Sequence, residues 1–104
     1  MTDDIENKLH QLTQILVDEL ISITPESMSE IQFELVATDD GGADIGLLEN
    51  HPEVPHVALS TKIYEVAPVY ILYVKQYVKN WSRSLIIITE SSGSWVVNVE
   101  FENT

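Results

Sequence analysis

The hydrophobic and polar positions of this sequence change their spacing several times along the chain, and each change marks an expected element. In residues 3 to 23 the apolar side chains recur every three or four positions, which places them on one face of a helix. The stripe consists of Ile5, Leu9, Leu12, Leu16, Leu20 and Ile23. Neighbouring apolar residues widen it, so this helix is expected to pack broadly against a sheet and to end at Pro25.

A spacing of two follows. Residues 30 to 37 alternate between apolar and polar side chains, which predicts a strand with one face toward water. Asp39-Asp40-Gly41-Gly42 then predicts a tight turn, because Asp and Gly tolerate positive φ angles. Residues 43 to 48 are expected to return as a second strand. A loop should follow over residues 49 to 55, and a short third strand over residues 56 to 60 is an open alternative.

Residues 61 to 80 fit two interpretations. Their apolar positions follow helical spacing, yet the segment is rich in β-branched and aromatic residues, which favour a strand. Helix and strand therefore both stay open for residues 61 to 70. We predict a helix over residues 66 to 80, because the run is too long for one strand and Pro68 is tolerated in a first helical turn.

The last part of the chain predicts a β-hairpin. Residues 84 to 89 and 95 to 101 are two β-rich runs, and Gly93 supplies a left-handed position between them. The predicted order is helix, strand, strand, an optional strand, helix, strand, strand. This order indicates a single α+β domain over residues 1 to 104: an antiparallel sheet of four to five strands with two helices packed on one face.

The charge of the sequence is strongly negative, with 17 acidic and 5 basic side chains for a formal net charge of −12. The surplus lies in residues 1 to 61, where Lys8 is the one basic side chain, whereas residues 62 to 104 are balanced. A one-signed surface speeds the encounter with a partner of opposite sign and repels nucleic acid. The sequence therefore predicts a basic protein partner and no nucleic-acid partner.

Several function classes lack a supporting signal. The sequence has no cysteine, no phosphate-binding glycine loop and no nucleophile motif, so we do not expect an enzyme. The acidic residues near Gly41 miss the calcium-loop pattern, and His51 and His56 lack a recognised zinc spacing, so neither a metal nor a cofactor is predicted. No apolar run approaches the length of a membrane span, and the acidic start is unlike a signal peptide. We expect a cytoplasmic protein that does not enter a membrane.

The C-terminal third resembles the YezG-like family of small bacterial immunity proteins, which end in two alternating strands joined at a Gly-containing turn. The similar positions are Trp81, Leu85, Ile87, Thr89, Gly93, Trp95, Val97, Val99, Phe101 and Glu102. The segment Ile23-Thr24-Pro25-Glu26 is similar to the opening of the family, and the resemblance covers about half of the chain. It implies a protein that binds and neutralises a cognate toxin, often a nuclease.

The leading hypothesis is therefore an immunity protein whose carboxylates take the place of substrate phosphates on a basic toxin. The expected partner-binding residues are Glu34, Asp39, Asp40, Asp44, Glu49 and Glu53. A rival hypothesis is a small acidic dimeric chaperone for a secreted effector, because such chaperones have a similar element order. Both a monomer and a homodimer are compatible with the sequence.

A group of aromatic residues gives a second expectation. Tyr70, Tyr77 and Trp81 are spaced by seven and four positions, so on a helix they share one face. Tyr and Trp are enriched at binding hot spots, which makes this stripe a candidate secondary interface. Packing in the core is the alternative.

Overall fold

The computed structural model describes residues 2–104, and the side chains from residue 4 onward. Its elements in chain order are α1 (Thr2–Ile23), β1 (Glu30–Ala37), β2 (Ala43–Leu47), a short 3₁₀ helix (Val54–His56), α2 (Thr61–Tyr77), β3 (Trp81–Ser91) and β4 (Ser94–Asn103). No helix within residues 2–104 combines the length and the apolar character that crossing a bilayer requires.

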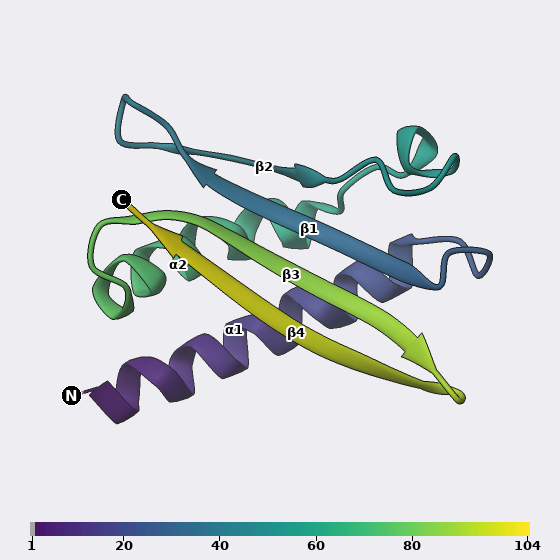
Figure 1. Ribbon diagram of the computed structural model, residues 1–104, viewed down its shortest axis with the longest axis horizontal. Coiled ribbons are helices and arrows are strands. Elements are labelled where there is room, and N and C mark those ends of the chain that lie inside the picture. The colour runs from purple at the N-terminus through teal and green to yellow at the C-terminus, as the bar shows by residue number, and fades with distance from the viewer. Residues whose placement is uncertain (1) are drawn as a thin grey trace.

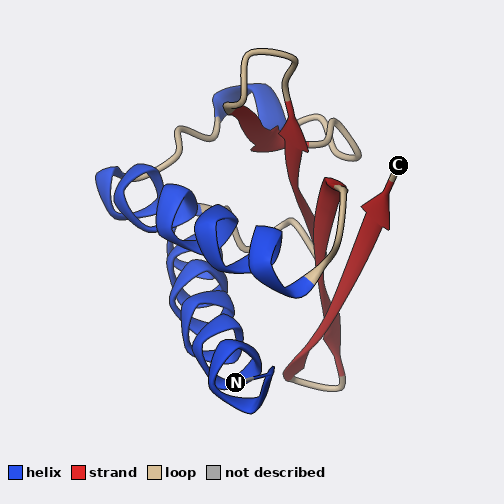
Figure 2. Ribbon diagram, turned by 90° about the vertical axis from the view of Figure 1, so that its left-hand side faces the viewer, coloured by secondary structure: helices blue, strands red, loops and turns tan. Residues whose placement is uncertain are grey.

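The four strands form one antiparallel sheet in the order β2-β1-β3-β4 (Figure 1). The two hairpins are β1–β2 and β3–β4, and they are joined through the pairing of β1 with β3. In that central pairing Phe33 lies opposite Ile86. Both helices lie on one face of the sheet, and the other face is bare (Figure 2). The predicted α+β fold is confirmed.

The core lies between the helices and the two central strands. The stripe predicted for the first helix supplies Leu16 and Leu20, and the alternation of β1 supplies Phe33, all of them fully buried. Each side chain of this kind contributes about 1.5–3 kcal/mol when it leaves water. The spacing of apolar residues in each element therefore determines which face turns inward.

The alternative third strand over residues 56 to 60 is wrong. The chain instead forms the 3₁₀ helix Val54–His56 and then an irregular segment that leads into α2. Pro55 lies in the first turn of that 3₁₀ helix, where its fixed φ fits and its missing N–H costs nothing. Only Val54 is buried here, and it packs against the core.

The helix predicted over residues 66 to 80 is present, but its bounds are shifted. It starts at Thr61 and ends at Tyr77. Ser60 caps it: its hydroxyl accepts from the Ile63 amide at 3.3 Å and donates to Glu19 of α1 at 2.9 Å. The open question for residues 61 to 70 is thereby settled as helix. Pro68 lies inside the helix and not in its first turn, which leaves the carbonyl of Tyr64 without its usual helical donor.

The turn of the last hairpin agrees with expectation. Ser92 and Gly93 both have positive φ angles, 52° and 81°. This is the type I′ geometry whose twist matches that of the two flanking strands. The left-handed position predicted for Gly93 is confirmed.

Candidate functional site

The face of the sheet that the helices leave bare is the candidate site (Figure 2). Side chains of neighbouring strands that lie opposite one another point to the same face, so the register assigns every position. We call this surface the open face; its residues are Glu30, Gln32, Glu34 and Val36 of β1, Asp44 and Gly46 of β2, Arg83, Leu85, Ile87, Thr89 and Ser91 of β3, and Ser94, Val96, Asn98, Glu100 and Glu102 of β4.

The centre of the open face is apolar. Leu85 of the central strand β3 is only 7% exposed although no helix covers it, and Ile87 and Val36 beside it are half-buried. The cross-strand neighbours of Leu85 are Glu34 of β1 and Glu100 of β4. An apolar centre with a polar surround is the usual anatomy of a protein–protein interface.

The surround is acidic. The open face carries the five carboxylates Glu30, Glu34, Asp44, Glu100 and Glu102, and one basic side chain, Arg83. Three of the carboxylates come from the acidic first half of the sequence and two from the balanced second half. The fold thus gathers negative charge onto one surface from segments that are far apart in the chain.

Arg83 connects three strands across this face. Its Nε donates to Glu34 of β1 at 2.6 Å, and its Nη1 donates to Glu102 of β4 at 3.2 Å. The hydrogen bond to Glu34 is the main reason why the pKa of Arg83 is raised; desolvation lowers it and Glu102 raises it further. The arginine is held by two carboxylates, and both carboxylates are partly neutralised in return.

The carboxylates therefore differ in how strongly they are engaged. Glu30 accepts from Gln32 at 2.9 Å and from Asn50 at 3.4 Å, so two amides orient it. Asp44 and Glu100 are exposed, and among the side chains described, residues 4–104, no hydrogen bond or ion pair holds either of them. These two are the most available to a cationic partner.

The basic residues other than Arg83 lie in the helical layer. Lys62 and Lys75 are on α2 and Lys79 follows it, while Lys8 is on α1. Lys75 reaches from α2 to donate to the carbonyl of Gly41 at 3.2 Å, next to the turn that joins β1 and β2. The lysines thus lie outside the open face, and the helices that carry three of them also carry Asp4, Glu6, Asp18, Glu19 and Glu65.

The six partner-binding residues expected from the sequence are not brought into one cluster. Glu34 and Asp44 belong to the open face, where their strands pair at Val36–Asp44 and Glu34–Gly46. Asp39 and Asp40 are exposed in the turn between these strands, and Glu49 and Glu53 lie past the opposite end of β2. Strand β2 separates the two groups by roughly 15 Å, given about 3.3 Å per residue.

Asp40 has a local structural task. It hydrogen-bonds the hydroxyl of Thr38 and accepts from the amide of Gly42 at 3.0 Å. These two hydrogen bonds lower the pKa of Asp40, in that order of importance. The side chain closes the turn, where Gly41 has a φ of 87°, so its carboxylate is already partly satisfied within the chain.

The candidate secondary interface is corrected for two of its three residues. Tyr70 is fully buried, and Trp81 is 7% exposed with its Nε1 donating to Ser84 at 2.8 Å. Tyr70 faces the sheet from α2, and Trp81 begins β3 and does not continue the helix, so neither can meet a partner. Only Tyr77 is exposed, and its hydroxyl donates to Glu6 of α1 at 2.8 Å.

Sequence reasoning missed Glu30, Glu100 and Glu102 as members of the acidic surface. The alternation in their strands indicates that each points to the polar side of a strand. Which strands are neighbours was not predicted, because β1 and β3 are far apart in the chain. Glu34 pairs with Leu85, and Leu85 pairs with Glu100. Glu34, Leu85 and Glu100 therefore lie in one row across the sheet.

Within residues 2–104 no group of three or more His, Asp or Glu side chains is arranged to hold a metal ion. The open face offers carboxylates at its surround and aliphatic side chains at its centre, a chemistry that suits the binding of a cationic protein. A scan against protein-family models gives no match, and a search of curated proteins finds no similar sequence.

Proposed function

We propose that this chain is an immunity protein, and that it binds and neutralises a basic, nuclease-type toxin domain through its open face. The observation that supports this proposal is the arrangement of five carboxylates and one arginine around an apolar centre on an uncovered sheet. The resemblance to the YezG-like immunity family in the sequence points to the same class of function.

The mechanism follows from what a nuclease must present to its substrate. A nuclease binds the phosphates of its substrate with Lys and Arg side chains, which form a cationic surface. Carboxylates at a similar spacing can form ion pairs with the same side chains. Negative charge on the open face attracts this surface during encounter and raises the association rate. The half-buried aliphatic side chains of Val36 and Ile87 then exclude water, and the toxin loses access to nucleic acid.

The individual carboxylates have different parts in this mechanism. Asp44 and Glu100 carry charge that nothing within the described residues neutralises, so they are proposed to make the main contacts. Glu34 forms an ion pair with Arg83, and this pair is proposed to stabilise the conformation of the open face. Asp39 and Asp40 extend the negative field beyond the end of the sheet.

The experiment is to recover the chain from its host at low salt and identify the bound proteins by mass spectrometry. The proposal expects a basic nuclease-like domain in a one-to-one complex that dissociates in high salt and whose nuclease activity is inhibited by the added chain. A bound partner that is acidic, or that stays fully active in the complex, would contradict it.

A second candidate function, a dimeric chaperone for a secreted effector, has one observation in its favour. Helix α2 exposes Tyr64, Pro68 and Leu72 at a spacing of four, and Tyr64 and Leu72 are 58% and 59% exposed. Such a stripe is a candidate for helix–helix contact between two copies. A dimer that Leu72→Asp dissociates, together with a bound secreted effector, would favour this function over the first.

A further inference from the structure

Strand β4 is a long edge strand that carries two carboxylates, Glu100 and Glu102, but neither lysine nor proline. It runs over ten residues, Ser94–Asn103, and pairs only with β3. The other edge strand, β2, has five residues. Edge strands commonly carry lysine, proline or a bulge that prevents further pairing. β4 contains no Lys or Pro, and its register irregularity is confined to the end near Trp81.

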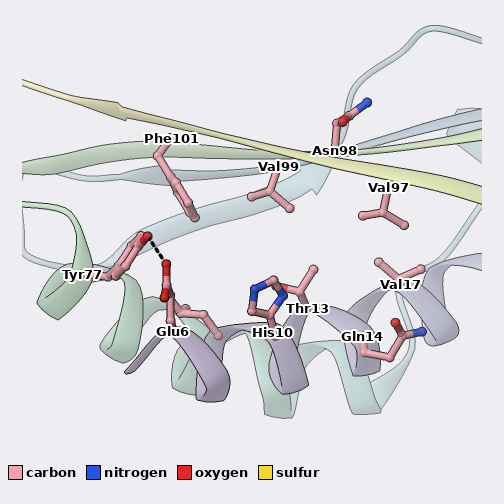
Figure 3. A pocket seen from close by; sticks show the side chains of 11 residues that line it. Glu6, His10, Thr13, Gln14, Val17, Tyr77, Val97, Asn98, Val99 and Phe101 are labelled. Carbon is pink, nitrogen blue, oxygen red and sulfur yellow. Dashed lines mark hydrogen bonds between the residues drawn. The ribbon is translucent and has the colours of Figure 1, made fainter. Parts of the chain in front are cut away.

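The helix-facing side of β4 is apolar and incompletely covered. Trp95, Val97 and Phe101 are 36%, 37% and 36% exposed, although their neighbours Ile86 and Ile88 on β3 are fully buried. A groove of about 430 Å³ separates this side of β4 from α1 (Figure 3). Val97, Val99 and Phe101 point into the groove toward α1, whereas Asn98 points away from it.

The sequence of β4 is self-complementary about Asn98. In an antiparallel pair of two β4 strands centred there, Trp95 faces Phe101 and Val97 faces Val99 on the helix side. On the open side Val96 faces Glu100, and Ser94 faces Glu102. Aromatic and β-branched cross-strand pairs are the ones that stabilise sheets, and no two like charges are opposite each other.

Neighbouring registers are worse. Side chains of directly opposed residues in an antiparallel pair point to the same face of the sheet. The two-fold axis of the pair must therefore pass through a residue and not between two residues. A centre at Glu100 places two carboxylates directly opposite. A centre at Val97 leaves Phe101 opposite Gly93, and a centre at Val99 leaves Trp95 opposite Asn103. The register at Asn98 alone among these four pairs both aromatic side chains with each other.

We propose that β4 is the docking site of a second copy of this chain, paired antiparallel through the register centred at Asn98. The two-fold axis is perpendicular to the sheet, so both helical layers lie on the same side. The result is a continuous eight-stranded sheet in which the two α1 helices run antiparallel beneath the junction. The open faces of both copies form one surface, a consequence independent of what that surface binds.

The absence of cysteine from the sequence makes a direct test feasible. In Asn98→Cys the two sulfurs meet at the axis, where opposing Cα atoms of an antiparallel pair are about 4.5–5.5 Å apart, within disulfide range. In Val96→Cys the two Cα atoms are displaced by four residues, roughly 13 Å, which a disulfide cannot bridge. In the proposed register, Val96 of one copy lies opposite Glu100 of the other. A mixture of the Val96→Cys and Glu100→Cys chains is therefore expected to form a disulfide between the two variants.

The variants are oxidised with a glutathione redox buffer and compared by non-reducing electrophoresis, after circular dichroism shows that each is folded. We expect about ten times more covalent dimer for Asn98→Cys than for Val96→Cys, since only the first geometry permits the bond. Covalent dimer should increase with added salt, because each copy carries a net charge of −12.

Three results would overturn the proposal. Equal linking of Asn98→Cys and Val96→Cys would show random collision, and no linking of either would show that the edge stays unpaired. If a dimer forms that Leu72→Asp dissociates, and if the Asn98→Cys disulfide does not trap this dimer, the contact between copies lies on α2. None of these results bears on whether the open face binds a basic partner. Binding to the open face can be measured whether the chain is a monomer or a dimer.

Discussion

The guanidinium of Arg83 lies 2.6 Å from the carboxylate of Glu34 and ties the two central strands together on the open face. Glu102 holds the same guanidinium from β4 at 3.2 Å. This arrangement fixes one positive charge near one end of an otherwise negative surface. Arg83 therefore supports the sheet, and it also weakens the field that the open face presents to a cation.

Replacing Arg83 by alanine is expected to have opposite effects on stability and on association. The free energy of unfolding should fall by about 1 kcal/mol, the usual upper value for a partly exposed ion pair. The association rate with a basic partner should rise, because the open face becomes more negative. Chemical denaturation and stopped-flow binding measure the two effects. Lys62→Ala removes the same charge from the exposed side of α2 and should leave the association rate nearly unchanged.

Tyr70→Phe is expected to keep or raise stability. The Tyr70 hydroxyl is buried and makes no hydrogen bond of normal geometry, and burial raises its pKa although the neighbouring Ser84 partly offsets that shift. Removing a buried polar group that lacks a partner is neutral or favourable, by up to about 1 kcal/mol. Thermal unfolding measures the change, and a marked loss of stability would show that the hydroxyl has a partner in solution.

Tyr77→Phe is expected to lower stability at neutral pH. The Tyr77 hydroxyl donates to Glu6, and this hydrogen bond is the main reason why the pKa of Tyr77 is raised. A raised pKa means that the stabilisation is present below the unfolded value, near 10, and is lost as the pH rises through the folded value. The difference between the two proteins should thus vanish at strongly alkaline pH. The edge contact with Phe101, at 6.1 Å between ring centroids, does not depend on the hydroxyl.

Asp40→Ala should destabilise the turn between β1 and β2, whereas Asp39→Ala should not. Asp40 accepts two hydrogen bonds in that turn, and they lower its pKa. A lowered pKa means that the stabilisation is present above the unfolded value and is lost as the pH falls through the folded value, below about pH 4. The unfolding midpoint as a function of pH checks this prediction, and equal effects of the two variants would contradict it.

Gly93→Ala should lower the free energy of unfolding by about 1 kcal/mol, because Gly93 has a φ of 81° that a side chain disfavours. Gly46→Ala is the matched control: Gly46 lies in β2, has no positive φ, and a Cβ there would meet nothing within 4 Å. Urea denaturation of both variants gives the comparison. Similar losses for both would show that the turn at Ser92 and Gly93 is not a constraint on the fold.

The parts of the fold that depend on local pattern were predictable from the sequence. The stripe of the first helix, the alternation of residues 30 to 37 and the last hairpin all appear where their spacing placed them, to within a few residues. The start of α2 was misplaced because Pro68 was assigned to the first helical turn, whereas Ser60 caps the helix eight residues earlier and Pro68 lies in its interior.

The open face could be predicted only in part. Glu34 and Asp44 were identified from the acidic first half, but Glu100 joins them through the long-range pairing of β1 with β3. The burial of Tyr70 and Trp81 has the same origin, because it depends on where the sheet passes the helices. Spacing along the chain assigns a residue to one side of its own element and does not say what covers that side.

The most direct test of the proposed function is the association rate of the purified basic partner with two charge-reversal variants. Glu100→Lys changes the open face, and Glu65→Lys makes the same change on the exposed helical side. We predict that Glu100→Lys slows association about tenfold at low salt and weakens its salt dependence, whereas Glu65→Lys has a much smaller effect. Equal rates for the two variants would contradict the account, because the open face would then attract the partner no more than any other surface.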